Sequence, residues 1–519
     1  MKIIYLQSWK GFIIWKTHNR SAELPYYWLI LRKLRSVTCI CCMKNLIMIE
    51  FRNHLAVFLL RGEYIVNNMV TDKLNVYKEM GYCDYFNNRA RGMGRERSSL
   101  EQFDNYHVLT EQETRIQKQI MLEHENSYTD NKNVLYLHIP FCLTRCDFCP
   151  YYVEKYNRDK VLEYLAALSE EIEIISRTNY AGTTKFQCLY IGGGTPSVLD
   201  AAAIEKLLKL IKSNFQFMED AEFTFESNVT TLSEEKIIKM KESGINRVSL
   251  GIQTLNDRLL KELGCAHNTV IAKKMIDLLL KYKMKVNLDF IFGLVNQSTE
   301  EVLQDLKQIS EMSGLEQLTF FPLKIMPNTK LALLLDSEKI DIKEHTANLL
   351  LLDKIIEEEF NKLGFEREQS PVFYHKKGTP EHRYVSTGTR VLGLGASAGT
   401  LIDYGEFSNY SRVDDYIASI KNTGCGSPFC GPITMQQAYE RYILYSIIYL
   451  NRSVPDSKGI IELNFREYYG IEMGDKYDKV LEDLRRLRFV KVGDDGKISF
   501  TQRMWHVLSM EKIGMPSII

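Results

Sequence analysis

From residue 133 onward, short β-prone apolar runs alternate with amphipathic helical stretches such as "RDKVLEYLAALSEEIEIIS". The β-prone runs read "VLYLHIP", "FQCLYIGGG", "EFTFESN", "RVSLGIQT", "KVNLDFIFGL" and "QLTFFPLKIMP". This alternation is typical of βα units built around a parallel sheet. Six units are two short of a closed eightfold barrel. We therefore predict an α/β fold with a partial (β/α)6 barrel, whose active face lies at the C-terminal ends of its strands.

Helix boundaries can be placed within this pattern. The helix after the third strand is predicted to begin after Ser233 and to end at Gly244, because these residue types suit an N-cap and the position after a C-cap. After Pro327 the alternation stops. A helix is then expected from Lys343 to Leu363, followed by a loop-rich section containing "GTRVLGLGASAG", residues 388–399.

The C-terminal part has a different pattern. From about Gln436 the sequence predicts two helices and then a hairpin that turns at residues 493–496 within "RFVKVGDDGKISF". Helices followed by a hairpin suggest a small winged-helix-like module. Because the formal net charge of the chain is zero, a packing or lid domain is favoured over one that binds nucleic acid.

The first residues do not share these patterns. Residues 1 to about 70 are basic and rich in Trp and Tyr, without helix or strand periodicity, and "CICC" at 39–42 has no partner ligands at a suitable spacing. We expect a poorly structured extension, with Met69 as a plausible alternative start. The predicted domains are the extension (1–108), the barrel (109–330), a flanking helical and glycine-loop region (331–432) and the winged-helix-like domain (433–519).

Composition sets the broad class of protein. The chain has 519 residues, of which 45% are hydrophobic and 25% are charged, as in a soluble globular protein. Eleven cysteines without the dense, even spacing of a secreted disulfide scaffold favour a reducing compartment, so we expect a cytoplasmic location. The apolar stretch 26–60 is broken by charged residues, and no membrane span is predicted.

Three cysteines stand close together after the first predicted strand: Cys142, Cys146 and Cys149. Three thiolates on one loop can bind three irons of a [4Fe-4S] cluster, which leaves the fourth iron with an open coordination site. A zinc site is the alternative, and it needs a fourth ligand such as Asp147 or His138.

Polar residues also stand near the predicted strand ends. Strand alternation places Glu226 on the face opposite Phe223 and Phe225, and it places Asp289 opposite Phe290. Apolar residues suit the helix-covered outside of a barrel, so both carboxylates are predicted to point inward. Because a buried carboxylate needs a partner, either a polar ligand or a packed polar network is expected there.

The cysteine spacing resembles the C-x3-C-x2-C signature of the radical S-adenosylmethionine (SAM) superfamily. With "YLHIPF", "GGGTP" and "GIQT" on successive strands, the chain from about residue 135 is similar to one branch of that superfamily. This branch contains oxygen-independent coproporphyrinogen III oxidase, a related haem chaperone and anaerobic haem-degrading methyltransferases. The resemblance implies two cofactors, a [4Fe-4S] cluster and S-adenosyl-L-methionine, and reductive cleavage of SAM to a 5′-deoxyadenosyl radical.

The resemblance also implies a set of SAM-binding residues, whereas a catalytic residue toward the substrate stays unknown. The set comprises Tyr136, Phe148, Gly193, Gly194, Thr195, Glu226, Gln253 and Asp289. Within it, Glu226 is expected to bind the SAM amino group. The glycine loop 393–399 matches one that in this branch lies near a second SAM or the substrate, although the residues alone indicate only a flexible loop.

Two positions depart from the oxidase pattern. Tyr151 stands where the oxidase has a further cysteine, and Cys265 stands where it has an arginine that holds the SAM carboxylate. Lys324 is a candidate replacement cation, and His267 is interpreted as an exposed loop histidine. Cys425 and Cys430 provide only two ligands, too few to hold an auxiliary iron–sulfur cluster.

The resulting hypothesis is a radical SAM enzyme that acts on a tetrapyrrole, either as an oxidoreductase like coproporphyrinogen III oxidase or as a haem-modifying methyltransferase. The expected electron donor is of the flavodoxin or ferredoxin type. The alternatives are a non-catalytic haem chaperone of the same family and a metal-stabilised structural protein.

Overall fold

The computed structural model describes two units, residues 1–80 and 81–519, and each is described here by itself. In the first unit the described parts are five strands. In the second unit the described residues are 111–126, 132–149, 153–323, 329–331, 342–367, 373–377, 389–402, 405–432, 435–450, 458–493 and 498–501. The candidate cation Lys324, the departure from the oxidase pattern at Tyr151 and the alternative start Met69 lie outside the described residues.

The first unit contains strands where we expected no strand periodicity. Strands β1 (Tyr5–Trp9) and β2 (Phe12–Lys16) pair antiparallel, as do β3 (Val37–Met43), β4 (Leu46–Phe51) and β5 (His54–Leu59) in a second sheet. These segments are nearly continuous apolar runs rather than alternating ones, so a search for period-two patterns misses them. Their Val, Ile and aromatic content nevertheless suits strands. The predicted boundary at residue 108 stays a prediction.

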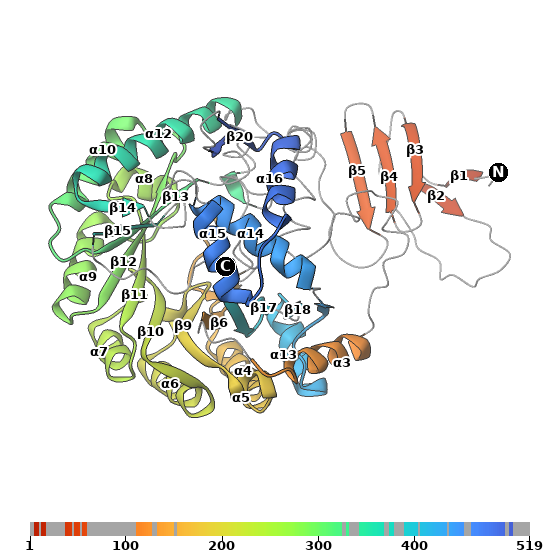
Figure 1. Cartoon of the computed structure of the whole chain (residues 1–519), viewed down its shortest axis with the longest axis horizontal. Helices are drawn as coiled ribbons and strands as arrows, with labels where there is room; N and C mark the ends of the chain where they lie inside the picture. Colours follow the sequence, from red (N-terminus) through yellow and green to blue (C-terminus); the bar gives the residue numbers. More distant parts are fainter. Residues whose placement is uncertain are drawn as a thin grey trace. The chain divides into compact units, whose positions relative to one another are not determined.

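A parallel sheet organises the second unit, as predicted (Figure 1). Its six central strands adjoin one another in chain order and pair parallel throughout. They are β6 (Asn133–Ile139), β9 (Lys185–Gly193), β10 (Gln216–Asn228), β11 (Arg247–Gln253), β12 (Lys285–Phe292) and β13 (Gln317–Pro322). Because parallel strands end at the same edge of a sheet, the residues predicted to bind cofactors are brought to one end of the barrel.

Helices cover the convex face of this curved sheet (Figure 1). The longer ones are α4 (Arg158–Ser176), α6 (Ala201–Asn214), α7 (Glu234–Glu242), α9 (Thr269–Lys281), α10 (Thr299–Ser310) and α12 (Ile342–Lys362). Shorter ones are α5 (Asn179–Thr183), η3 (Pro196–Val198) and α8 (Asp257–Glu262). Helix α7 confirms its predicted boundaries, since the Ser233 side chain accepts a hydrogen bond from Lys236 N–H and Gly244 follows the C-cap with φ of 100°.

The alternation of side chains along the strands separates two environments. Leu135, Leu189 and Phe225 belong to the large apolar core that the helices complete. Residues of the opposite parity, including Tyr136, Tyr190 and Thr224, lie on the inner side of the barrel, which is aromatic and polar. The predicted parity of the third and fifth strands is therefore confirmed, with the phenylalanines outside and the carboxylates inside.

The sheet continues beyond the six strands on both sides. Next to β6 lies β16 (Arg390–Leu394), which pairs parallel with it, and then the antiparallel β17 (Gly399–Ile402), β18 (Gly405–Ser408) and β19 (Phe429–Pro432), with α13 (Val413–Thr423) between the last two. At the other edge lie β14 (Phe365–Arg367) and β15 (Phe373–Lys376). Residues 388–399 were expected to lie in a loop-rich section, but residues 390–394 form a fully buried strand and a second buried strand begins at Gly399. Glycines within these short strands hide their pattern.

The remaining elements flank the sheet. Helix α3 (Glu111–Leu122) contacts β19 through a Cys430–Met121 sulfur contact of 3.5 Å. The C-terminal module has its own apolar core and contains α14 (Met435–Leu450), α15 (Lys458–Tyr469), α16 (Lys476–Arg486) and the hairpin β20 (Val490–Val492) and β21 (Ile498–Phe500). The winged-helix-like pattern is thus present, with three helices where two were expected. Within the described residues, no helix is long and apolar enough to cross a membrane.

Candidate functional site

The loop with the three cysteines follows directly from strand β6. A two-residue strand, β7 (Phe141–Cys142), pairs with β8 (Glu154–Lys155) and closes the base of this loop. Cys142, Cys146 and Cys149 are all partly exposed, and Cys149 N–H donates to Cys146 C=O over 3.2 Å. Burial raises the pKa of the Cys142 thiol to about 11.

The three thiols do not form a site for a single metal ion. Among the described residues, no group of three or more His, Cys, Asp or Glu side chains is placed to hold a single metal ion. A [4Fe-4S] cluster makes a different demand, because each thiolate binds a different iron. Three partly exposed thiols spaced along one loop fit that donor set.

The "GGGTP" turn after β9 is bound to the cysteine strand. Gly194 N–H donates to Ile139 C=O over 2.9 Å, and Thr195 N–H donates to Phe141 C=O over 2.8 Å. The Thr195 hydroxyl lies 3.2 Å from Cys142 Sγ. A Cβ at Gly194 would come within 2.8 Å of the Phe141 carbonyl oxygen, so only glycine permits this approach.

Glu226 of strand β10 is hydrogen-bonded to strand β9 and to the "GGGTP" turn that follows it. Its carboxylate accepts a hydrogen bond from the Tyr190 hydroxyl at 2.6 Å and one from Gly193 N–H at 3.0 Å. The side chain is partly exposed at the end of β10. A Cβ at Gly192 would come within 2.7 Å of Glu226 Oε2, which explains a glycine at that position. The cysteine loop, the glycine turn and the Glu226 carboxylate, which is predicted to bind SAM, thus form one hydrogen-bonded unit.

Asp289 lies at the top of a polar network inside the barrel. It accepts hydrogen bonds from Ser249 Oγ at 2.8 Å and Asn287 Nδ2 at 2.7 Å, and Thr319 Oγ1 donates to Asn287 Oδ1 at 2.9 Å. Burial raises the pKa of Asp289, while the Ser249 hydrogen bond and the Arg247 charge oppose that rise. Asp289 itself is partly exposed whereas Asn287 and Thr319 are buried. The packed polar network is therefore present, and the partly exposed Asp289 carboxylate lies at its edge, whereas binding of a polar ligand there stays a prediction.

The predicted aromatic contacts lie in different surroundings. Tyr136 is buried inside the barrel, where its ring stacks on Tyr190 and its hydroxyl lies 2.9 Å from His138 Nδ1. Phe148 is partly exposed and packs against an apolar cluster that includes Leu263. Tyr190 was not among the predicted site residues, and His138 was predicted only as a candidate zinc ligand. The alternation within "VLYLHIP" and "FQCLYIGGG" places both side chains on the inner face of the barrel, and this is the sequence signal that could have identified them.

Cys265 contacts the cysteine loop. Leu263 C=O accepts a hydrogen bond from Asp147 N–H at 3.3 Å, which holds the residue 263–265 segment against residues 146–148. The Cys265 and Cys146 side chains hydrogen-bond, which lowers the pKa of Cys146 and raises that of Cys265. Asp147 of the cysteine loop also forms an ion pair with Lys330, with 2.5 Å between Asp147 Oδ1 and Lys330 Nζ.

His267 corrects an expectation. We expected an exposed loop histidine, but its side chain is buried and its Nε2 lies 3.3 Å from Ile252 C=O. Burial lowers the pKa of this imidazole. The surrounding sequence "GCAHNT" is typical of a surface loop. The burial of His267 results from its packing against β11, which the local sequence does not predict.

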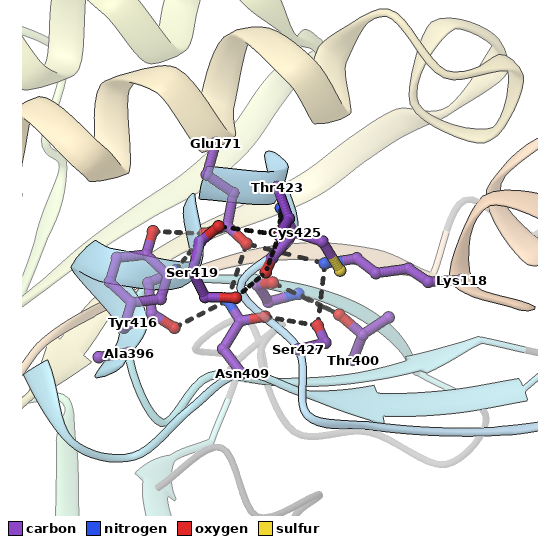
Figure 2. A network of polar contacts seen from close by, with 12 residues as sticks. Lys118, Glu171, Ala396, Thr400, Asn409, Tyr416, Ser419, Thr423, Cys425 and Ser427 are labelled. Atoms are coloured by element: carbon purple, nitrogen blue, oxygen red, sulfur yellow. Dashed lines mark hydrogen bonds and ion pairs between the residues drawn. The ribbon is translucent and has the colours of Figure 1, made fainter. Parts of the chain in front are cut away.

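The glycine turn between β16 and β17 is fixed by a buried carboxylate from α4 (Figure 2). Glu171 accepts hydrogen bonds from Gly395 N–H at 2.7 Å, Tyr416 Oη at 2.7 Å and Asn409 Nδ2 at 2.8 Å. Lys118 of α3 lies 3.8 Å from the same carboxylate.

This network places the turn beside the site. Tyr164 Oη donates to His138 C=O at 2.6 Å and accepts from Ala396 N–H at 3.1 Å, which ties the glycine turn to the end of β6. Glu171 could not be recognised from "SEEIEII", where it appears as one of several surface glutamates. Cys425 and Cys430 are buried in the same region, and burial raises the pKa of Cys430 to about 12.

Comparison with known proteins agrees with this geometry. A family model described as "Radical SAM superfamily" matches residues 136–309. A heme chaperone HemW from Buchnera aphidicola is 34% identical over 197 residues, which are 38% of this chain and 51% of the relative. Anaerobilin synthase from Escherichia coli O157:H7 is 32% identical over 201 residues, 38% of this chain and 45% of the relative. The chain thus spans about half the length of these curated relatives.

A solved structure extends the similarity in fold. Coproporphyrinogen III oxidase (HemN) from Escherichia coli, described as a radical SAM enzyme, superposes with a TM-score of 0.62 at 21% identity. The match covers 79% of this chain and 97% of that one, and it shows the fold.

Residues 136–309 thus match the radical SAM superfamily, and the curated relatives of the chain lie in the predicted branch of heme chaperone, anaerobilin synthase and oxygen-independent coproporphyrinogen III oxidase. The two predicted cofactors, a [4Fe-4S] cluster and S-adenosylmethionine, are those of this superfamily. Which residue contacts which part of them stays a prediction.

Proposed function

We propose that this protein is a radical SAM enzyme that acts on a tetrapyrrole, a porphyrinogen or haem. The observation that carries the proposal is the hydrogen-bonded unit formed by Cys142, Thr195, Gly193 and Glu226 at the open end of the barrel. When bound, the cluster and SAM supply the one-electron cleavage that yields a 5′-deoxyadenosyl radical. The protein supplies binding, orientation and the exclusion of side reactions.

Each part of the site has a task in this proposal. Cys142, Cys146 and Cys149 hold the cluster. Glu226 accepts the SAM ammonium, for which its fixed carboxylate supplies a charge-assisted hydrogen bond. Asp289 lies on β12, which β11 separates from the β10 strand of Glu226, and its carboxylate suits the ribose hydroxyls. Because Glu226 and Asp289 are anchored before any ligand arrives, little ordering is left for the binding step.

Whether the activity is oxidative decarboxylation or methyl transfer depends on the substrate side of the site. The flavodoxin- or ferredoxin-type electron donor and the cytoplasmic location belong to the same proposal, since a cluster with an open iron needs a reducing environment. The winged-helix-like module and the glycine turn 393–399 are the parts we assign to the substrate side.

A non-catalytic haem chaperone is the second candidate. It is favoured by the relatives named HemW, which carry the name heme chaperone. The two functions differ in a measurable way, because a chaperone binds haem without turning over SAM.

The deciding experiment is anaerobic incubation of the reconstituted protein with SAM, a reductant and a panel of porphyrins, followed by mass spectrometry of all products. Repeated formation of 5′-deoxyadenosine or S-adenosylhomocysteine together with a modified tetrapyrrole supports the enzyme. Stoichiometric haem binding with no SAM-derived product in any mixture supports the chaperone.

The cluster assignment has its own test. We expect the reconstituted protein to contain about four irons and four sulfides, and alanine at Cys142, Cys146 and Cys149 together to abolish both. Cys425→Ala is the matched control, because Cys425 is buried elsewhere in the fold. Iron retained by the triple variant would contradict the assignment.

A further inference from the structure

The chain makes a strained turn where β11 ends. Gln253 has a φ of 69°, and Thr254 N–H donates to Ile252 C=O over 3.0 Å. A hydrogen bond that spans three residues around a central residue of positive φ defines the less common form of the γ-turn. A non-glycine residue in this conformation is unfavourable and persists only where its surroundings impose it.

Two buried groups impose the turn from outside the barrel. Asp305 of α10 accepts a hydrogen bond from Thr254 Oγ1 at 2.7 Å with one carboxylate oxygen and from Leu255 N–H at 2.9 Å with the other. His267 contributes the second contact, to Ile252 C=O. Thr254 and Asp305 are at most 3% exposed, so water does not compete for these hydrogen bonds.

This arrangement is unfavourable for the fold in two ways. Besides the strained backbone, it places a carboxylate under a helix, where burial raises the pKa of Asp305 to about 6. A glycine at position 253 would remove the first problem, since glycine adopts positive φ freely. The chain instead carries a glutamine whose side chain is partly exposed and folds back over the strand. A Cβ at Gly251 would lie 2.8 Å from Gln253 Nε2, so the preceding glycine makes room for this amide.

We propose that Asp305, Thr254 and His267 are positioning residues that hold Gln253 in the strained turn, so that its amide lies across the end of β11 and contacts SAM. This inference rests on the proposed SAM site. It adds residues on the helix-covered side of β11, which contact neither SAM nor the cluster. Loosening the turn is expected to weaken SAM binding and to leave the cluster in place.

The test uses the full chain, reconstituted and unreduced, with SAM affinity measured by calorimetry, iron content by a colorimetric assay and the unfolding midpoint by circular dichroism. Thr254→Val and Asp305→Asn release the turn with little change in side-chain volume. Each is expected to weaken SAM binding about three- to tenfold, the range for one lost hydrogen bond, with unchanged iron content. Thr184→Val and Asp483→Asn, at buried positions elsewhere, control for a general loss of stability and should bind SAM like the parent.

Gln253→Gly supplies the sharpest contrast. Glycine relieves the strain and removes the amide, so the unfolding midpoint should rise while SAM affinity falls. A lower midpoint, or unchanged affinity in this variant or in both Thr254→Val and Asp305→Asn, would overturn the inference. If the parent protein itself bound no SAM, the proposed function would fail instead, so the two failures are distinct.

Discussion

Within the proposed SAM site, Glu226 is the residue that we expect to contribute most to SAM binding. Alanine there would remove an acceptor that is already fixed by Tyr190 and Gly193. A charge-assisted hydrogen bond contributes roughly 1.5–3 kcal/mol, so we expect SAM affinity to fall about tenfold to 150-fold. Glu226→Gln retains an acceptor and should lose less.

Calorimetry on the reconstituted protein measures this effect. Glu234→Ala, an exposed carboxylate at the start of α7, is the control and should not change the affinity. Parent-like SAM binding by Glu226→Ala would remove Glu226 from the site.

Cys265 stands where the related oxidase has an arginine, and it hydrogen-bonds to Cys146. The thiol itself gives SAM no charge-assisted contact, so Cys265→Ala is expected to change SAM affinity little. Cys265→Arg should be neutral or tighten binding, provided that the segment 263–265 has room for it. Abolished binding in the alanine variant would assign the cysteine a direct role. The same titrations as for Glu226 decide the question.

At the scale of elements, Asp305 links α10 to the β11 turn and makes stability depend on pH. Its pKa is raised from 3.8 to about 6 in the folded chain, so folding favours the protonated form. This contribution is fully present below about pH 4 and is lost as the pH rises through 6. The shift corresponds to about 3 kcal/mol as an upper estimate.

Asp305→Asn removes this dependence. The parent should therefore lose stability relative to the variant between pH 4 and pH 6.5, as measured by chemical unfolding at each pH. A constant difference between the two proteins across this range would show that Asp305 does not titrate there.

How far the sequence predicts these elements depends on whether their pattern is local. The six parallel strands and the inward Glu226 follow from alternation, which is a property of neighbouring residues. The strand β16 escaped prediction because its partner β6 lies about 250 residues earlier and because Gly393 interrupts its short apolar run. The strained Gln253 and the buried His267 and Glu171 escaped for the same reason, since tertiary contacts alone create them.

For the whole molecule, we expect the N-terminal residues to be dispensable. Deleting residues 1–68 should leave cluster content and SAM cleavage unchanged, because no site residue lies there. Deleting residues 1–124 should instead destabilise the barrel, since it removes Lys118 and leaves the buried Glu171 carboxylate without that cation. Iron content and unfolding midpoints of the two truncated proteins test this prediction. Loss of the cluster on the shorter deletion would show that the extension is part of the functional unit.

The pairing of β16 with β6 has a consequence for biosynthesis. The strand that leads into the cysteine loop is among the first of the barrel to leave the ribosome, yet its second neighbour emerges some 250 residues later. Until then β6 is an edge strand with one side of its backbone unpaired, a state that invites association with other chains. A chain stalled or cleaved before residue 389 should therefore aggregate, and a cluster delivered during synthesis would meet a loop whose supporting strand is only half enclosed.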